Sequence, residues 1–253
     1  MLYRKDIVQG FKNLGLREGD IVLVHSSLRS FGYVDGGAET VIDSLLEAVG
    51  ESGTVMVPTL TGKSTDGKEN PPEFDVRTTP CWTGKIPETF RQRPEARRSL
   101  HPTHSVSAIG AGRDELLKGH ENGASPCDRF SPYYKNALSG GYVMLIGVDQ
   151  ESNTTIHCCE EVAGVPYHLQ KEVTETSIKG YNGEEILVRN RLHDWNKPPT
   201  DFNRFDGVFE KHGIMKTGKI GNSTIRLIDA KAMVELAVDM LTKNPYYLLI
   251  EKG

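Results

Sequence analysis

The stretch GDIVLVHSS, residues 19–27, decides the fold. Its apolar run at 21–24 has no polar alternation, a pattern typical of a strand that is buried on both faces. A helical apolar stripe at 4–15 precedes it, and a second stripe at 38–49 leads to another buried run, GTVMVP at 53–58. The order helix, strand, helix, strand predicts a βαβ unit in an α/β protein, with loops at the carboxyl ends of its strands.

The remainder of the chain continues these alternating signals. Residues 140–148 (GGYVMLIGV) predict another buried strand, and 154–165 predict a short helix directly after it. Residues 172–180 and 184–195 predict an antiparallel hairpin that turns at Gly183. The other predicted elements are helices at 85–93, 112–120, 201–213 and 230–243, a strand in the second half of 97–110, and loops at 59–83 and 123–134. No repeat or linker divides the chain, so we expect one domain over residues 1–253.

Composition limits the classes of partner. The formal net charge of −4 argues against binding to nucleic acid or to an anionic membrane surface. No run approaches the roughly 18 apolar residues of a membrane span, and the N-terminus lacks a secretory apolar run. The four cysteines have no framework spacing, which indicates reduced thiols. We therefore expect a cytoplasmic protein, a monomer or a homodimer, that acts on a small molecule.

Two segments have the composition of a ligand-binding site. Residues 25–37 (HSSLRSFGYVDGG) follow a buried strand, and their glycines and small serines let a phosphate or amide-rich chain approach the main chain. They match neither the P-loop nor the GxGxxG pattern, so a plain strand-to-helix turn explains them equally well. Residues 97–105 (RRSLHPTHS) contain two arginines suited to phosphates, together with His101 and His104. A solvated arginine pair and structural histidines are the commoner explanation of such a segment.

A third segment, NTTIHCCEE at 153–161, carries a candidate general base. On a helix, His157 has Glu160 three residues away and Glu161 four residues away, so either carboxylate can face the imidazole. A carboxylate on one ring nitrogen fixes the tautomer and leaves the other nitrogen basic. Thr154 or Thr155 caps the helix or donates a hydrogen bond to an oxyanion. An ordinary surface His–Glu pair gives the same pattern.

Taken in order, these segments resemble the aminoglycoside 3-N-acetyltransferase family, the antibiotic N-acetyltransferases that are unrelated to the GNAT fold. The resemblance covers nearly the whole chain in family order, and its combination of motifs is specific. The stretches that carry it are VLVHSSLRSFGYVDGG (22–37), GTVMVPT (53–59), FDVRTTP (74–80), RRSLHPTHSVSAIG (97–110), SP (125–126), LIGV (145–148), TTIHCCEEVAGVPY (154–167) and GKIGNSTIRLIDAKAMVELAVDML (218–241).

The resemblance implies a three-layer α/β/α fold with a mostly parallel central sheet, acetyl-CoA as cosubstrate and direct transfer in a ternary complex. His157 matches the family's histidine base, and Glu160 matches the carboxylate of its HxxE motif. Main-chain N–H groups of the 26–31 loop or the Thr155 hydroxyl would meet the oxyanion. The positions that match the lining of the pantetheine arm, the CoA phosphates and the thioester are Ser26, Ser27, Leu28, Ser30, Phe31 and Gly32, then Arg98 and Ser105.

We therefore predict an antibiotic-resistance type of acyltransferase that acetylates an amine of an aminoglycoside or of a similar small amine, without a metal. Two alternatives stay open. A zinc hydrolase could use His101, His104 and His157 as ligands, although HExxH and CxxC are missing from the sequence. A CoA-binding family member without aminoglycoside activity would have the same cofactor residues. Cys158 or Cys159 could act as a nucleophile, but packing as small apolar residues is the simpler role.

The acceptor is not inherited with the family. Residues 62–73 and 193–201 resemble no particular resistance enzyme, and an aminoglycoside needs several carboxylates in the cleft to match its ammonium groups. The aromatic residues Tyr133, Tyr134 and Trp195 could line an acceptor cleft, whereas we expect Trp82 in the core. The acidic candidates from the loops are Asp66, Glu69, Glu73, Asp75, Asp194, Asp201 and Asp206.

Overall fold

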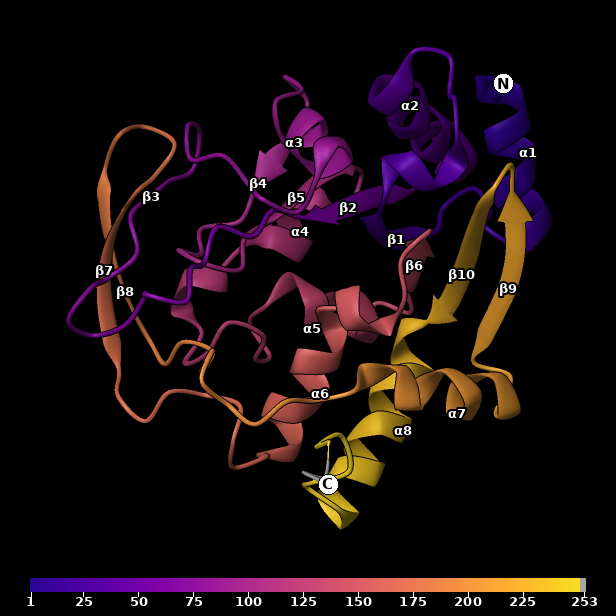
Figure 1. Ribbon diagram of the computed structural model, residues 1–253. Coiled ribbons are helices and arrows are strands. Elements are labelled where there is room, and N and C mark those ends of the chain that lie inside the picture. The colour runs from indigo at the N-terminus through magenta and orange to yellow at the C-terminus, as the bar shows by residue number, and fades with distance from the viewer. Residues whose placement is uncertain (251–253) are drawn as a thin grey trace.

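A computed structural model describes residues 1–250 and shows an α/β protein built on a seven-stranded mixed sheet (Figure 1). The strand order is β4-β5-β2-β1-β6-β10-β9. The strands are β1 (Ile21–Ser26), β2 (Thr54–Pro58), β4 (Arg97–Arg98), β5 (Val106–Gly110), β6 (Tyr142–Ile146), β9 (Met215–Ile220) and β10 (Ser223–Asp229). The decisive strand β1 lies in the middle, with β2 on one side and β6 on the other.

The direction of the strands corrects one prediction. Strand β1 pairs in parallel with β2 and with β6, as the βαβ pattern predicted. The four outer pairs are antiparallel, so the expectation of a mostly parallel sheet was wrong. A buried apolar run does not reveal strand direction, because helices cover the antiparallel strands β5 and β10 as well. The hairpin β9–β10 was missed altogether, since the segment 215–229 alternates apolar and polar residues only weakly.

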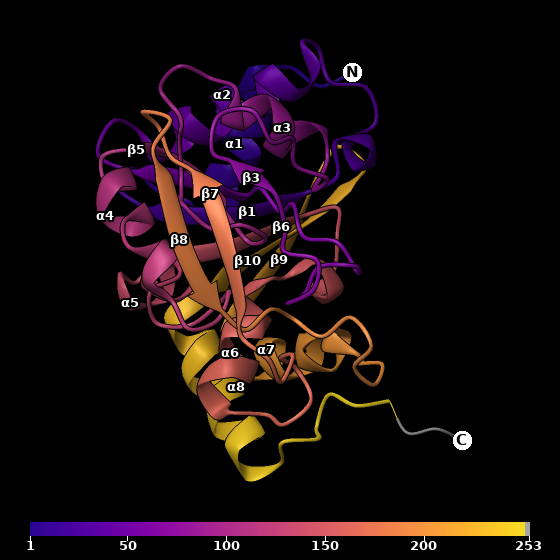
Figure 2. The same ribbon diagram turned by 90° about the vertical axis from the view of Figure 1, so that its left-hand side faces the viewer.

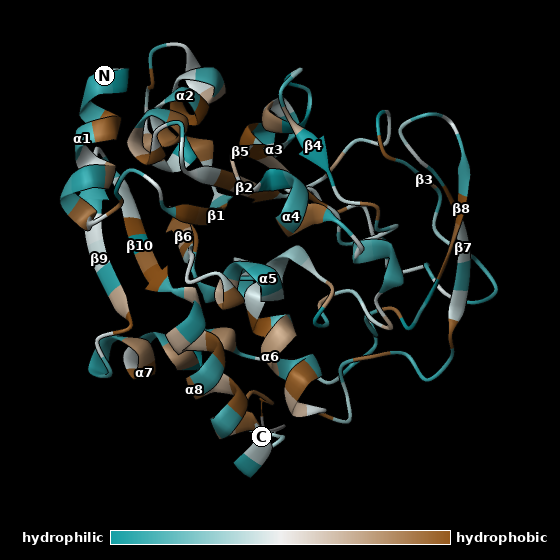
Figure 3. Cartoon of the chain, turned by 180° about the vertical axis from the view of Figure 1, so that it is seen from behind, coloured by the Kyte–Doolittle hydropathy of each residue, from teal (hydrophilic) through white to brown (hydrophobic). Residues whose placement is uncertain are grey.

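Helices pack on both faces of the sheet. Successive side chains of a strand point to opposite faces, and the core follows this rule: Val22 and Val24 pack with α1, α2 and α3, whereas Leu23 packs with α5, α6 and α8. Figure 3 shows apolar residues gathered on these strands and on the inner sides of the helices. The helices are α1 (Arg4–Leu14), α2 (Gly37–Val49), α3 (Lys85–Arg91), α4 (Arg113–Leu117), α5 (Pro132–Leu138), α6 (Thr155–Ala163), α7 (Asp206–Lys211) and α8 (Ala230–Lys243). None of the helices in residues 1–250 has the length and apolar character that crossing a membrane requires.

A second, three-stranded sheet stands at the side of the molecule (Figure 2). Strands β7 (Thr174–Lys179) and β8 (Glu185–Asn190) form the predicted antiparallel hairpin, which turns at Gly183. Strand β3 (Phe74–Asp75) adds to β7 in parallel and comes from the segment that was predicted to be a loop. This hairpin returns the chain toward the main sheet, so that residues after 190 reach the site described below.

Helix α5 was also missed, because Pro132 at its start indicated a loop. Pro132 occupies the first turn, where proline needs no hydrogen-bond partner, and Ser131 accepts a hydrogen bond from the main chain of Tyr134. The proline therefore starts a helix instead of interrupting one.

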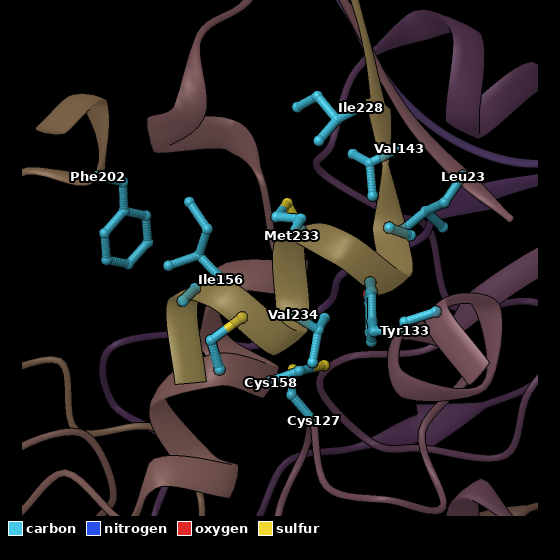
Figure 4. Packing of buried hydrophobic residues seen from close by; sticks show 14 of the residues in the cluster. Leu23, Cys127, Tyr133, Val143, Ile156, Cys158, Phe202, Ile228, Met233 and Val234 are labelled. Carbon is cyan, nitrogen blue, oxygen red and sulfur yellow. The ribbon is translucent and has the colours of Figure 1, made fainter. Parts of the chain in front are cut away.

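Helix α6 is fixed by one apolar side. Ile156 and Cys158 are fully buried and pack in the cluster that contains Met233 and Val234 of α8 (Figure 4). Cys159 is buried too, and burial raises the pKa of its thiol. The cysteines of α6 thus pack as small apolar residues.

Candidate functional site

An open cavity of about 460 Å³ lies beside the carboxyl ends of β1 and β6. In an open α/β sheet, ligands bind outside the carboxyl ends of the strands, at the point where the strand order reverses. Strand β1 lies at such a point, with β2 on one side and β6 on the other. The wall comes from the end of β1 and from the segments after β2, after β6 and after the β7–β8 hairpin. His25 and Ser26 lie in this wall, and His25 Nε2 and Ser26 Oγ are buried there without a hydrogen-bond partner.

The side chain of His157 lines the cavity, and Glu160 lies behind it. His157 Nδ1 is 2.7 Å from Glu160 Oε2, and the carboxylate is fully buried while the imidazole keeps 21% of its surface exposed. The spacing of three residues on α6 brings the two groups together. In this pairing Nδ1 donates its proton to the carboxylate and Nε2 is left as a base.

Burial shifts the pKa values of His157 and Glu160 in opposite directions. It lowers the pKa of His157 well below the ordinary value, helped by the neighbouring His193 and His168, so the imidazole is neutral at pH 7. It raises the pKa of Glu160 to about 7, although the Lys197 ammonium, 3.8 Å away, acts to lower it. The pair therefore holds a neutral base beside a carboxyl group that changes its charge near neutral pH.

The neighbouring carboxylate of Glu161 has a different role. It accepts hydrogen bonds from the Ser125 hydroxyl, the main-chain N–H of Cys127 and His193 Nε2, the last at 3.0 Å. Burial raises its pKa, but the contacts with His168 and His193 outweigh burial and hold the pKa at about 2. Glu161 thus fixes the loop at 125–127 and His193, while Glu160 is the carboxylate that contacts His157.

Sequence reasoning missed two histidines that surround His157. The His168 ring stacks on the His157 ring with 4.7 Å between centroids, and the His193 ring meets it edge-on at 4.6 Å. His104 lies against His193 at 4.2 Å and also lines the cavity. His168 follows α6 directly, and His193 follows the β7–β8 hairpin. Main-chain hydrogen bonds between these two segments, from Asp194 N–H to His168 O and from Gln170 N–H to Leu192 O, hold both rings beside His157.

The predicted CoA loop contributes one side chain to the cavity wall, Ser26. Ser30 Oγ bonds to Ser27 O and Ser223 Oγ, and Phe31 is buried in the core. Leu28 also packs against that core, and Gly32 follows with a positive φ. Most side chains of this loop that were predicted to bind the ligand therefore contact the rest of the protein instead. Gly147, at the end of β6, permits this close packing: a Cβ there would lie 1.9 Å from Ser30 Oγ.

Arg98 and Ser105 lie outside the cavity lining. The Arg98 guanidinium is buried and donates hydrogen bonds to the Thr59 hydroxyl and carbonyl, to Ser105 Oγ and to Thr79 O. Burial lowers its pKa to about 10. With Nε, Nη1 and Nη2 each donating inside the protein, Arg98 joins β4 to the segment after β2 and lies away from the cavity.

The two threonines at the start of α6 face different ways. Thr154 lines the cavity, whereas Thr155 is fully buried and its hydroxyl has no partner. Of the two predicted threonines, Thr154 is therefore the one that borders the cavity.

The three histidines of the zinc alternative do not assemble into one site in residues 1–250. His101 Nδ1 accepts two main-chain N–H groups, and Nε2 meets the Asn190 amide, so both ring nitrogens are occupied. Ligand atoms of His157, His168 and His193 do come within 4.8 Å of one another. However, the rings of His157 and His168 lie nearly parallel, 19° apart, and in-plane lone pairs of stacked rings converge poorly on one ion.

Aromatic and charged side chains border the opening of the cavity. Trp82 is 56% exposed and lines the cavity, which corrects its predicted place in the core, and Trp195 is 50% exposed nearby. Of the seven acids proposed for the acceptor, Asp194 alone lines the cavity; Glu151, which was not predicted, joins it. Lys197 adds a cation to the same wall.

An imidazole held by a buried carboxylate at the wall of an open cavity is the arrangement of a general acid–base site. Comparison with known proteins adds the class of reaction. The model of the aminoglycoside 3-N-acetyltransferase family matches residues 23–242, and the chain belongs to this family of acyltransferases.

Individual relatives agree with this assignment over nearly the full length of the chain. The SPbeta prophage-derived aminoglycoside N(3')-acetyltransferase-like protein YokD of Bacillus subtilis (strain 168) is 31% identical over 259 residues, covering 95% of this chain and 93% of that protein. The solved structure of aminoglycoside acetyltransferase AAC(3)-Xa has a TM-score of 0.83 at 30% identity, covering 96% of this chain and 93% of that one. A mutant of aminoglycoside acetyltransferase AAC(3)-IVa, solved in complex with a gentamicin, has a TM-score of 0.82 at 26% identity, covering 98% and 92%.

Proposed function

We propose that this chain transfers an acetyl group from acetyl-CoA directly to an amine, with His157 as the general base and Glu160 as the residue that orients it. The observation that carries the proposal is the pair of contacts of His157: Nδ1 bonded to a buried carboxylate and the ring bordering the cavity. Acetyl-CoA supplies the acyl group as a substrate. We further propose that the chain acts as one domain, because the cavity wall takes residues from Val24 to Lys197.

The chemistry assigned to His157 is proton removal. An alkyl amine is mostly protonated at pH 7 and must be neutral to attack a carbonyl carbon. Neutral His157 takes a proton at Nε2, and ionised Glu160 stabilises the imidazolium that forms. General-base help of this kind contributes roughly 10²–10⁴-fold. The Thr154 hydroxyl at the cavity wall is the donor that we assign to the oxyanion, and losing such a donor costs on the order of 3 kcal/mol.

For the acceptor we propose an aminoglycoside or a smaller amine that carries few positive charges. Glu151 and Asp194 at the rim match one or two ammonium groups, Lys197 repels further ones, and Trp82 and Trp195 offer flat faces to a ring. The relative solved with a gentamicin shows that the family fold accepts an aminoglycoside in that protein.

An acceptor screen tests this function. Free thiol is measured after the protein is mixed with acetyl-CoA and one of three groups of amines: aminoglycosides, simple diamines and amino sugars. The proposal expects thiol release that depends on one of these amines and a product one acetyl group heavier by mass spectrometry. Tight CoA binding without thiol release from any amine would support a binding protein instead, and thiol release without an acetylated amine would indicate a thioesterase.

A further inference from the structure

The pair His157–Glu160 separates two cavities. The front cavity described above is bordered by His157, and a second cavity of about 210 Å³ is bordered by Glu160 and Glu161. His168 is the residue that borders both. The base therefore faces the substrates, while its carboxylate faces away from them.

The back cavity is polar and reaches the surface. Its rim includes Gly164, Pro166 and Arg191, which are all exposed. Its wall holds polar atoms that have no partner in the protein: Glu160 Oε1 and both ring nitrogens of His168. Leaving such groups without any partner costs about 1–3 kcal/mol each. The cavity has room for several water molecules close to these buried atoms.

The reaction needs a route by which a proton leaves the site. An alkylammonium that becomes an amide loses two protons from its nitrogen. One proton ends on the sulfur of the leaving thiolate, since a thiol is mostly protonated at neutral pH. The other must reach bulk solvent in every turnover. With the thioester and the amine bound in the front cavity, which His157 borders, the direct path from His157 to water would be closed.

We propose that His168 and the back cavity form a proton exit, through which the proton taken up by His157 leaves by way of Glu160 while the substrates still occupy the front cavity. The proposal rests on the function proposed above. Once His157 is an imidazolium, its Nδ1 proton crosses the 2.7 Å hydrogen bond to Glu160 Oε2. From there it passes to His168 Nδ1, 3.2 Å from the same oxygen, and the other nitrogen of this ring releases a proton toward the back cavity that His168 borders.

The pKa values of the two groups favour the first transfer, from His157 to Glu160. The pKa of Glu160 is raised by burial and that of His157 is lowered by burial, so the carboxylate takes the proton from the imidazole readily. Burial lowers the pKa of His168 to about 3, so this ring relays the proton without holding it. The other charged groups around Glu160 are Lys197, whose Nζ is 3.8 Å from Oε1, and Glu161, whose carboxylate is 3.6 Å from His168 Nε2. Glu161 draws the proton on toward the back cavity, and Lys197 repels it.

The test replaces the imidazole at the exit by a ring without nitrogen, His168→Phe. With an amine that the wild-type protein acetylates, kcat should fall by at least about tenfold while both KM values stay unchanged. Small imidazole added to the solution should restore part of the rate in proportion to its concentration, and the wild-type rate should not respond. The matched control is His212→Phe, an exposed histidine at the end of α7 that should leave the rate unchanged.

A second variant guards against misfolding of the first. Leu169→Trp keeps His168 but fills the back cavity that Leu169 borders, and it should lower kcat in the same way. A normal kcat in either folded variant would overturn the exit. So would a lowered kcat that added imidazole does not restore in folded His168→Phe. If the wild-type protein acetylates no amine, the proposed function itself fails; if it does and the variants keep its rate, only the exit fails.

Discussion

Replacing Glu160 by glutamine separates two effects of this carboxylate. Glu160 accepts the Nδ1 proton of His157 at 2.7 Å and is fully buried. Glutamine has nearly the same shape but no charge, so the imidazolium formed during the reaction loses its counter-charge. A hydrogen bond to a charged group contributes about 1.5–3 kcal/mol. We therefore expect kcat to fall roughly 10- to 150-fold.

The same substitution, although it lowers kcat, should raise the stability of the fold at alkaline pH. Burial raises the pKa of Glu160 from 4.5 to about 7 in the folded protein. The folded state thus binds the proton more tightly than the unfolded state. This contribution to stability is fully present below pH 4.5 and is lost as the pH rises through about 7. The loss amounts to about 3 kcal/mol, and glutamine, which does not ionise, avoids it.

Two measurements on Glu160→Gln decide the matter. Thiol release gives kcat, and thermal unfolding at pH 5 and pH 8 gives the pH dependence of Tm. Between these two pH values the Tm of the wild-type protein should fall further than that of the variant, by about 6–12 °C. Glu210→Gln, an exposed carboxylate on α7, is the control and should behave like the wild type. An equal pH dependence in all three proteins would refute the charge assigned to Glu160, and an unchanged kcat would refute its role beside His157.

Three further substitutions test the surroundings of the site. Gly147→Ala, at φ +63° with Ser30 in the space of a Cβ, should lower the free energy of unfolding by at least about 2 kcal/mol in a denaturant titration, and an unchanged value would contradict this packing. Arg98→Met should lower Tm without changing KM for acetyl-CoA, whereas a raised KM with normal Tm would assign the guanidinium to the CoA phosphates. Lys197→Met removes the cation that lowers the pKa of Glu160, so the acidic limb of the kcat–pH profile should move to higher pH; a fixed limb would speak against coupling between the two groups.

The parts of the fold that were predictable depend on local patterns. The buried run of β1 and the two amphipathic helices around it gave the central βαβ unit, because burial and helical period are both visible within a few residues. The direction of β5 and β10 was not visible, since it depends on where the connecting segments return. Pro132 misled the prediction of α5 because the same residue both ends and starts helices.

The candidate site also has contacts that local patterns predict and contacts that depend on long-range folding. His157 and Glu160 lie three residues apart on one helix, so their contact follows from helical geometry. His193 reaches the site because the β7–β8 hairpin returns the chain beside the segment of His168, a long-range pairing that no local pattern shows. The likeness of Arg98 to a CoA-binding position did not reveal that its guanidinium is buried and bonded inside the protein. Local spacing thus predicted the contact between His157 and Glu160, and long-range folding supplied the rest.

The most direct measurement is the turnover of His157→Ala at saturating acetyl-CoA and amine, with CoA binding measured by calorimetry on the same preparation. The imidazole borders the cavity without holding the fold, so the variant should bind CoA as the wild type does and lose roughly 10²–10⁴-fold in kcat. Wild-type turnover in a protein without this imidazole would show that another group removes the proton from the amine.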